Sequence, residues 1–322
     1  MACFEKAILN YDQELFMKLG MIGLGRMGGN MAQRLLLGGH QLVVYDVNAQ
    51  AIENSRSQGA IGASSIKEVV DNLVSPKIVW IMLPNGKPTD DVLDGLIAYL
   101  NPGDVLIDGG NTYYKDTQMR SSKLSGYGIH LIDVGISGGI WGLSDGYSLM
   151  VGGDEDIFIH IEPILKTLAP DPNLGYMYAG PSGAGHFVKM VHNGVEYGLM
   201  QAYAEGFELL RSKDEFDFNI SQIAHTWRYG SVVRSWLLDL VSRALDEDAS
   251  LENVSSYVAD SGEGRWTVQE SVDLGVPIPV ITAALQQRFR SRQEQPFSGR
   301  LLAALRYQFG GHAIQEVSKS EG

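Results

Sequence analysis

The sequence predicts an α/β fold, with a doubly wound and mainly parallel sheet in the first half and an all-α domain in the second. Up to about residue 180, short apolar runs alternate with helical stretches. That alternation is typical of parallel strands joined by right-handed helical crossovers. After residue 180 the apolar residues follow almost only the helical period. The two halves are therefore predicted to be two domains of different class.

Each predicted strand is a short apolar run that leads into Gly, Pro or Asn. The runs lie within residues 18–25, 41–48, 77–84, 104–111, 129–136, 147–153 and 176–180. Helical stretches lie between them, including 26–39, which Gly38 and Gly39 end, and 89–100. In the second half we predict a long helix over about 185–210, another through 221–241, and further helices to the end.

The domain boundary is predicted at the glycine-rich segment GPSGAGH, which begins at Gly180. Residues 17–182 then form the nucleotide-binding domain, and residues 183–322 form an all-helical domain for substrate binding and oligomerisation. Residues 1–16 form a leader that fits neither domain. Either the native chain starts at Met17, or the leader is a short extra helix. The leader lacks an apolar signal core and contains acidic residues, so we expect a cytoplasmic protein.

Composition and charge exclude several classes of function. The chain has 322 residues, with 25 basic and 38 acidic ones, and a net charge of −13. This balance disfavours binding to nucleic acid or to an anionic membrane, and the apolar runs are too short to span a bilayer. Cys3 is the only cysteine, which excludes an intrachain disulfide and a cysteine-based zinc site. No H-E-x-x-H pattern occurs, so we predict a mechanism without a metal.

The segment GLGRMG places Gly23, Gly25 and Gly28 in the G-x-G-x-x-G spacing, after a predicted strand and at the start of a predicted helix. This context is typical of a Rossmann-type dinucleotide site. Asp46, at the end of the next strand, suits the 2′-hydroxyl of the NAD ribose and would repel the 2′-phosphate of NADP. The alternative is a structural glycine turn. We predict NAD as cofactor, with further contacts from Leu24, Arg26, Met27, Leu83 and Asn111.

Two more polar, glycine-rich segments follow predicted strands. One is DGGNT, which contains Asn111, and the other is GISGG, which contains Ser137, Gly138 and Gly139. Each could be an ordinary turn. Because ligands of open parallel sheets lie at the carboxyl ends of the strands, the three loops together favour a shared site.

The segment KMVHNGVEYG places four polar residues on one face of the predicted long helix: Lys189, His192, Asn193 and Glu196. Met190, Val191, Gly194 and Val195 fall on the other side. One interpretation is an amphipathic helix that turns its polar stripe to water. The other is a catalytic stripe that faces a substrate, with the apolar residues packing behind it.

Arginines recur in three segments of the helical half. Arg265 and Thr267 lie in GEGRWT, Arg288 lies in QRFRSR, and Arg306 and His312 lie in RYQFGGH. Arginine binds carboxylate or phosphate in a bidentate manner. Taken one at a time, each of these arginines is better explained by a solvated surface charge than by a ligand.

Taken together, the segments resemble the 6-phosphogluconate dehydrogenase family over nearly the whole chain from Met17. Its fold and lysine helix are shared with the wider β-hydroxyacid dehydrogenases. The chain is similar to the short form of the family, whose members are typically tetramers, so we expect a homo-oligomer and favour a tetramer over a dimer. The matching segments are GLGRMGGNMAQRL, DGGNT, ISGG, KMVHNGVEYGLMQAYAEG, GEGRWT and FGGH.

The resemblance implies a role for each site residue. Lys189 would be the general base for oxidation of the 3-hydroxyl of 6-phosphogluconate, and Glu196 the acid that protonates C1 of the enediol left by decarboxylation. Binding of the sugar acid is implied for Asn111, Ser137, Gly138, Gly139, His192 and Asn193. Binding of the 6-phosphate is implied for Tyr197, Arg265, Thr267 and Arg288. In dimeric members, tail residues matching Arg306 and His312 reach a neighbouring subunit's site.

Two rival functions stay open at this point. A dehydrogenase of the 3-hydroxyisobutyrate type would have the same fold and base but no phosphate site, so Arg265 and Arg288 discriminate against it. A catalytically inactive NAD-binding protein has no need of both Lys189 and Glu196.

Overall fold

The computed structural model describes residues 16–315. The chain divides into two compact units that meet between Asn193 and Gly194. The boundary expected between residues 182 and 183 lies just before helix α9 (Ala184–Arg211), which contributes residues to both units. The predicted leader falls almost entirely outside the described residues.

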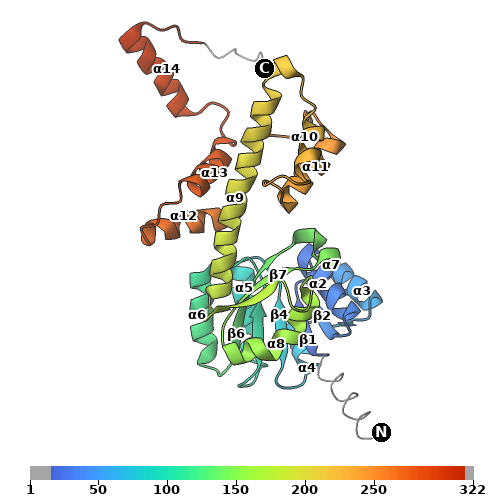
Figure 1. The fold of residues 1–322 in the computed structure, drawn as a ribbon. Helices are drawn as coiled ribbons and strands as arrows, with labels where there is room; N and C mark the ends of the chain where they lie inside the picture. Colours follow the sequence, from blue (N-terminus) through green and yellow to red (C-terminus); the bar gives the residue numbers. More distant parts are fainter. Residues whose placement is uncertain (1–15, 316–322) are drawn as a thin grey trace. The chain divides into compact units, whose positions relative to one another are not determined.

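Unit 1 is built on an eight-stranded sheet with the order β3-β2-β1-β4-β5-β6-β7-β8 (Figure 1). All neighbouring strands are parallel except β6 and β7, which are antiparallel. The predicted doubly wound, mainly parallel sheet is therefore confirmed. The strands are β1 (Lys18–Ile22), β2 (Gln41–Tyr45), β3 (Ile61–Gly62), β4 (Ile78–Ile81), β5 (Val105–Asp108), β6 (His130–Ser137), β7 (Ser148–Gly152) and β8 (Tyr176–Gly180).

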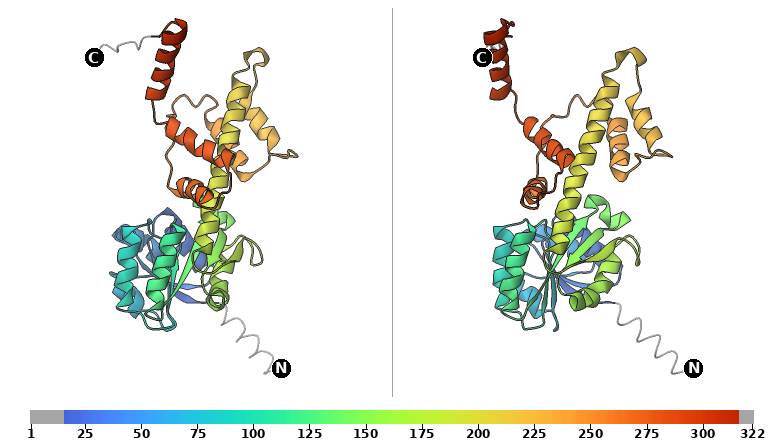
Figure 2. Two further views of the ribbon diagram at one scale, coloured as in Figure 1. Left: turned by 90° about the vertical axis from the view of Figure 1, so that its left-hand side faces the viewer. Right: turned by 60° about the vertical axis from the view of Figure 1, so that its left-hand side comes forward.

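Helices cover both faces of this sheet (Figure 2). One face packs against α2 and α8, through Met31, Leu35 and Ile164 among others. The opposite face packs against α4, α5 and α6, through Val69, Leu93 and others. The helices of this unit are α2 (Arg26–Leu37), α3 (Ala49–Ser57), α4 (Ile66–Asp71), α5 (Lys87–Ile97), α6 (Tyr114–Ser125), η1 (Gly139–Trp141), α7 (Gly142–Asp145) and α8 (Glu155–Leu168).

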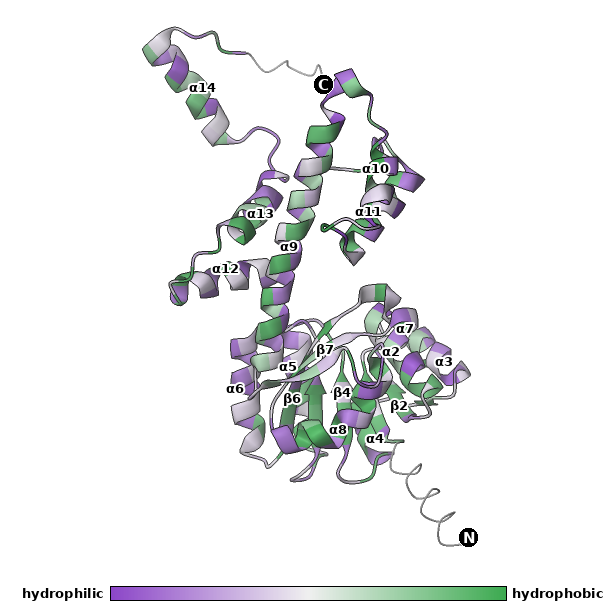
Figure 3. Ribbon diagram, in the orientation of Figure 1, coloured by the Kyte–Doolittle hydropathy of each residue, from purple (hydrophilic) through white to green (hydrophobic). Residues whose placement is uncertain are grey.

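The central strands are apolar on both sides because both faces are covered. All residues of β4 and β5 are buried, and Figure 3 shows the hydrophobic strands between helices of mixed polarity. This pattern is typical of parallel sheets with helices on both faces. The strand order reverses at β1, whose neighbours are β2 and β4. Ligands bind at such a switch point, outside the carboxyl ends of the strands.

Unit 2 is helical, as predicted. It contains the C-terminal part of α9, followed by η2 (Asp214–Phe216), α10 (Ile220–Trp227), α11 (Trp236–Glu247), α12 (Glu263–Asp273), α13 (Pro279–Arg290) and α14 (Phe297–Gly310). One small core joins Phe207, Ala224 and Leu238. A second joins Tyr197 of α9 to Ala284 and Leu285 of α13.

The prediction of one helix through residues 221–241 was wrong, because the structure has two helices there. Gly230 has a φ of +73°, in the left-handed region that ends a helix. Ser235 then starts α11, with its side chain accepting a hydrogen bond from the N–H of Leu238. The helix is therefore interrupted by a left-handed glycine and a new N-cap, although the apolar residues keep the helical period throughout.

Candidate active site

The glycine loop after β1 is a tight turn with no room for side chains at two of its three glycines. Gly23 has a φ of +93°, and a Cβ there would lie 2.4 Å from the carbonyl oxygen of Met82. A Cβ on Gly28 would lie 2.0 Å from the carbonyl oxygen of Gly23. By contrast, a Cβ on Gly25 would meet nothing within 4 Å. Gly25 therefore borders open space in front of the first N–H groups of α2, where a pyrophosphate fits.

Asp46 follows β2 and faces the same loop. Its Oδ2 accepts a hydrogen bond from the N–H of Leu24 at 2.6 Å, and its Oδ1 accepts one from the N–H of Asn48 at 2.8 Å. A cavity of about 550 Å³ adjoins it, lined partly by Tyr45, Ala63 and Ser64. A carboxylate has further acceptor capacity. A carboxylate fixed to the glycine loop, beside a cavity of ligand size, fits the adenosine half of a dinucleotide.

The loops after β4 and β5 pack directly beside the glycine loop. A Cβ on Gly110 would lie 2.6 Å from the carbonyl oxygen of Leu83, and a Cβ on Gly23 would lie 3.0 Å from the Leu83 side chain. Asn111 is exposed at the end of the β5 loop. Arg26 is exposed and Met27 half-buried at the start of α2. The predicted cofactor residues therefore lie in loops or helix starts that follow the carboxyl ends of the strands.

Lys189, His192, Asn193 and Ser137 form a second group of side chains in unit 1. His192 Nε2 lies 3.4 Å from the Ser137 hydroxyl, and its Nδ1 lies 3.5 Å from Lys189 Nζ and 3.3 Å from Asn193 Oδ1. A neutral His192 that donates to Ser137 through Nε2 can accept from the lysine at Nδ1. Ser137 ends β6 and is followed by Gly138 and Gly139, with φ values of +136° and +54°.

Two residues that place Lys189 were not singled out from the sequence. A Cβ on Gly135 of β6 would lie 2.4 Å from the Lys189 Cβ, so only glycine lets α9 approach the strand here. Asp133, also on β6 and fully buried, accepts hydrogen bonds from the N–H groups of Gly183 and His186 at 2.7 and 2.9 Å. A carboxylate at a helix N-terminus stabilises it through these bonds and the helix dipole. The signal available was the D-x-G pattern of Asp133 and Gly135, whose glycine is the first residue of GISGG.

The polar stripe of α9 is not turned to water. Lys189, His192, Asn193 and Glu196 are all half-buried. The expectation that the apolar residues pack behind the stripe was correct for Met190, which is 1% exposed, but wrong for Val191 and Val195. Their exposed fractions of 36% and 49% leave them on an open face of the helix in a single chain.

In unit 2, Tyr197 brings α9, α12 and α13 together. The guanidinium carbon of Arg288 lies 3.5 Å from the centre of the Tyr197 ring, and the Tyr197 hydroxyl accepts a hydrogen bond from the N–H of Ser261 at 3.4 Å. Gly264 packs against this ring, where a Cβ would come within 2.5 Å of it. Thr267 is buried, and its hydroxyl donates to the carbonyl of Glu263. The structure thus brings together Tyr197, Arg288 and the GEGRWT segment.

Arg265 is oriented by a residue outside the predicted set. Its Nε donates to Asp260 Oδ2 at 2.5 Å, and its guanidinium carbon lies 4.4 Å from the centre of the Phe289 ring. Arg292 donates to the other oxygen of Asp260. The hydrogen bond from Arg265, together with the one from Arg292, lowers the pKa of Asp260 to about 2. Arg265 itself is exposed, which leaves its outer N–H groups available to an anion.

Arg306 and His312 lie apart from these groups in sequence and in environment. Arg306 is on α14, whose residues are all exposed, and His312 follows the end of that helix. Their predicted role in a neighbouring subunit's site stays a prediction.

Comparison with models of known protein families shows the family to which the chain belongs. The family model for the NAD binding domain of 6-phosphogluconate dehydrogenase matches residues 18–180, and the model for the C-terminal domain of that enzyme matches residues 185–298. The chain belongs to the 6-phosphogluconate dehydrogenase family.

Two relatives match over nearly their whole length. YqeC of Bacillus subtilis, provisionally named a 6-phosphogluconate dehydrogenase, is 43% identical over 300 residues, which cover 93% of this chain and 100% of the relative. A Haloferax volcanii protein named as an NAD(+)-dependent, decarboxylating 6-phosphogluconate dehydrogenase is 44% identical over 299 residues, which cover 92% of this chain and 98% of the relative.

A solved structure supports the same assignment. The 6-phosphogluconate dehydrogenase of Plasmodium falciparum is 25% identical, with a TM-score of 0.79, and the match covers 94% of this chain but 67% of that one. No helix in residues 16–315 is long and apolar enough to cross a membrane.

Proposed function

We propose that this chain catalyses the oxidative decarboxylation of 6-phospho-D-gluconate to ribulose 5-phosphate and CO₂, with reduction of NAD. The observation that carries the proposal is the placement of Lys189 over Gly135, 3.5 Å from His192, in the unit that also holds the glycine loop. The family membership agrees with it, and so do the names of the two relatives that match over nearly their whole length.

Lys189 is the general base in this proposal. NAD held at the glycine loop would supply the acceptor for the hydride from C3 of the sugar acid. As the C3–H bond breaks, the Lys189 amine takes the proton of the 3-hydroxyl, and a 3-keto acid results. The lysine then returns that proton to the 3-keto oxygen while the bond to the carboxyl carbon breaks and CO₂ leaves. A lysine has an ordinary pKa of about 10.4, so a basic lysine requires an environment that disfavours its charged form.

Glu196 is the general acid in this proposal. It protonates the carbon that loses CO₂, which becomes C1 of ribulose 5-phosphate, while the neutral Lys189 amine takes back the proton of the enol hydroxyl as the C2 ketone forms. Glu196 and Lys189 are seven residues apart on α9, about two turns or 10 Å of helix. That spacing suits two proton transfers at separate atoms of a six-carbon substrate.

The remaining predicted residues bind the substrate. Asn111, Ser137 and the Gly138–Gly139 turn, with His192 and Asn193, hold the hydroxyl and carboxylate groups. Tyr197, Arg265, Thr267 and Arg288 bind the 6-phosphate, for which arginine geometry is well suited. We also propose a homo-oligomer, with a tetramer favoured, in which Arg306 and His312 serve a neighbouring subunit. The exposed apolar residues of α14 support this arrangement: Phe297, Leu301, Leu302, Leu305 and Phe309.

The proposal is tested by following NADH formation from 6-phosphogluconate with the purified protein, with NADP and 3-hydroxyisobutyrate as the alternative cofactor and substrate. We expect turnover with 6-phosphogluconate and a higher kcat/KM for NAD than for NADP. Turnover of 3-hydroxyisobutyrate alone would favour the rival dehydrogenase, and no turnover of either acid would contradict the enzyme assignment.

A pair of variants tests the phosphate site. Arg265→Ala should raise the KM for 6-phosphogluconate by roughly 10-fold or more, because one charged hydrogen bond is lost. Arg290→Ala is the matched control, since Arg290 is exposed on the same bundle and bonds only locally, to the carbonyl of Gln293. Equal KM values in the two variants would refute the phosphate role of Arg265.

A further inference from the structure

Arg120 on α6 is a buried cation that no part of the proposed reaction uses. Its side chain is 9% exposed. Its Nε donates to Asp90 of α5 at 2.8 Å, and its Nη1 donates to Asp108 at 3.3 Å. Longer contacts of 3.5 Å reach the hydroxyl of Thr112 and the side-chain oxygen of Asn85. One guanidinium therefore contacts the loops that follow both β4 and β5.

Its inner partner, Asp108, holds the loop that carries Asn111. Asp108 is fully buried at the end of β5. Its Oδ1 accepts from the N–H of Gly110 at 3.0 Å, and its Oδ2 accepts from the hydroxyl of Thr112 at 3.0 Å. Asn111 lies between these two anchored residues. The position of Asn111 is therefore determined by a carboxylate whose charge is balanced by Arg120.

The β5 loop has little room to adjust if that carboxylate moves. A Cβ on Gly109 would lie 2.4 Å from the Trp80 ring nitrogen, and a Cβ on Gly110 would lie 2.6 Å from the carbonyl oxygen of Leu83. The loop is thus pressed against the β4 loop, which contains the predicted cofactor contact Leu83. A displacement at Asp108 would pass to both loops.

We propose that Arg120 is a positioning residue of the active site, which sets the place of Asn111 and Leu83 through Asp108 and Asn85. Because the role of Asn111 is itself proposed, this inference rests on the proposed function. A buried carboxylate that loses its cation carries an uncompensated charge, which is strongly destabilising where it stands. Asp108 then has to recruit water or move, and the loop moves with it.

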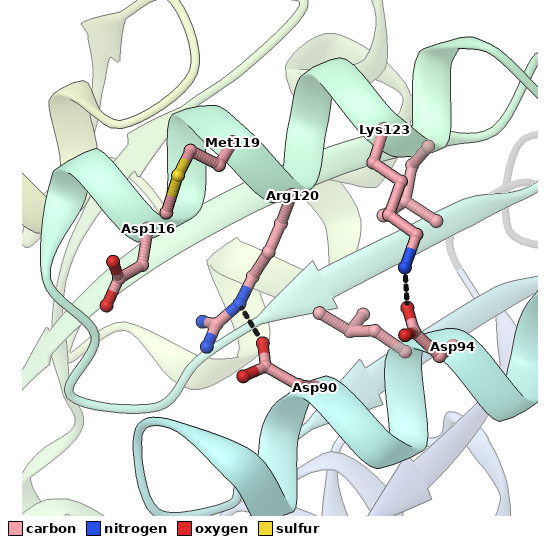
Figure 4. A pocket seen from close by; sticks show the side chains of 8 residues that line it. Asp90, Asp94, Asp116, Met119, Arg120 and Lys123 are labelled. Carbon is pink, nitrogen blue, oxygen red and sulfur yellow. Dashed lines mark hydrogen bonds and ion pairs between the residues drawn. The ribbon is translucent and has the colours of Figure 1, made fainter.

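The same pair of helices supplies a matched control. Lys123, one turn after Arg120 on α6, pairs with Asp94 of α5 at 2.6 Å, and both side chains are about half exposed. Figure 4 shows the two ion pairs side by side, with Arg120 directed to Asp90 and Lys123 to Asp94. Lys123→Met removes an α5–α6 bridge without a contact to either loop. Asp90→Asn removes the outer partner of Arg120 and leaves Asp108 paired.

The test compares Arg120→Met, Asp108→Asn, Asp90→Asn and Lys123→Met in the full-length protein. We expect Arg120→Met and Asp108→Asn to lower kcat/KM for 6-phosphogluconate by about 100-fold, the effect of a misplacement near 1 Å. We expect Asp90→Asn and Lys123→Met to stay within about twofold of the wild type, whatever their effect on Tm. If Arg120 only joined the two helices, Asp90→Asn would match Arg120→Met.

Hydrogen exchange gives a readout that does not depend on turnover. Arg120→Met and Asp108→Asn should increase exchange in peptides that contain residues 83–86 and 109–112, and Lys123→Met should not. Arg120→Lys keeps a cation but not the hydrogen bonds of the guanidinium, and it serves if Arg120→Met does not fold; it should show a smaller exchange change and a smaller kinetic loss in the same segments. Unchanged exchange and kinetics in a folded Arg120 variant would overturn the inference. Inactivity of the wild type would refute the proposed function alone, because the exchange comparison would still stand.

Discussion

The glycine-loop edge of unit 1 and the arginine cluster of unit 2 hold their functional groups by different means. At the edge, main-chain atoms approach so closely that a Cβ on Gly23 or Gly28 would overlap a carbonyl group. In the cluster, Arg265 and Arg292 are oriented by the carboxylate of Asp260 and by aromatic rings. The first arrangement depends on glycines, which have no side chain, and the second depends on charged side chains.

This difference predicts different sensitivities. Close main-chain packing is insensitive to salt and pH but does not tolerate an added methyl group. Ion pairs respond to pH and ionic strength and tolerate changes of size. Helix α9 links the two arrangements, because Lys189 belongs to unit 1 and Glu196 to unit 2.

The largest expected effect belongs to Lys189. Lys189→Met should lower kcat by about 10²- to 10⁴-fold, the usual contribution of a general base. NADH binding, measured by fluorescence titration, should change little, because the glycine loop is intact. Lys166→Met is a control, since Lys166 pairs with Glu162 one turn earlier on α8. Activity of Lys189→Met near the control value would show that another group takes the proton.

The glycine loop offers a second test within a single motif. Gly28→Ala should lower Tm and weaken NADH binding together, because its Cβ would lie 2.0 Å from the carbonyl oxygen of Gly23. Gly25→Ala should leave Tm unchanged, since its Cβ would meet nothing within 4 Å. It should still raise the Kd for NADH by roughly 10-fold, because the methyl group enters the space of the pyrophosphate. A stable Gly25→Ala protein with normal NADH affinity would place the pyrophosphate elsewhere.

The fold could be predicted from sequence because its signals are local. Apolar runs that end in glycine, proline or asparagine located every strand except the two-residue β3 (Ile61–Gly62), and the spacing of Gly23, Gly25 and Gly28 located the first crossover. Two features of the fold were harder to predict. The antiparallel strand β7 follows a turn from β6 that resembles any other glycine loop. The break between α10 and α11 depends on the left-handed backbone of Gly230, which an apolar period does not reveal.

Within the site, the residues that carry chemistry were easier to predict than those that place them. Lys189 and Arg265 stand out by type and spacing. Gly135 becomes visible as the partner of Lys189 only when β6 meets α9. Asp260 lies five residues before Arg265, but its second partner, Arg292, comes from the segment after α13. The exposed Val191 and Val195 show the same limit, because a helical period does not tell which face is covered.

Asp46 tests cofactor selection at the glycine-loop edge. Asp46→Ala removes the acceptor for the ribose 2′-hydroxyl and the charge that repels a 2′-phosphate. The ratio of kcat/KM for NAD to that for NADP should fall by about 10-fold, as expected for one charged hydrogen bond. The N–H of Leu24 also loses its acceptor, but that loss affects both cofactors alike and cancels in the ratio. An unchanged ratio would assign the selection to other residues.

The smallest expected effect concerns the pH dependence of the arginine cluster. Hydrogen bonds from Arg265 and Arg292 lower the pKa of Asp260 from 3.8 to about 2 in the folded protein. The carboxylate therefore stabilises the fold above the unfolded pKa of about 3.9, and this contribution is lost as pH falls through the folded value. Asp260→Asn should lower the free energy of unfolding at neutral pH, and the difference from the wild type should shrink as pH falls from about 4 to 2.

Chemical denaturation at several pH values measures this difference, with Asp71→Asn as the control. Asp71 pairs with Lys67 on the surface of α4, where both side chains are about half exposed, and such pairs contribute little. The control difference should therefore be small throughout. If the Asp260→Asn difference did not depend on pH, the cluster would be held by packing of the arginine guanidinium groups on the rings of Phe289 and Tyr197. It would then resemble the glycine-loop edge more closely than its charges indicate.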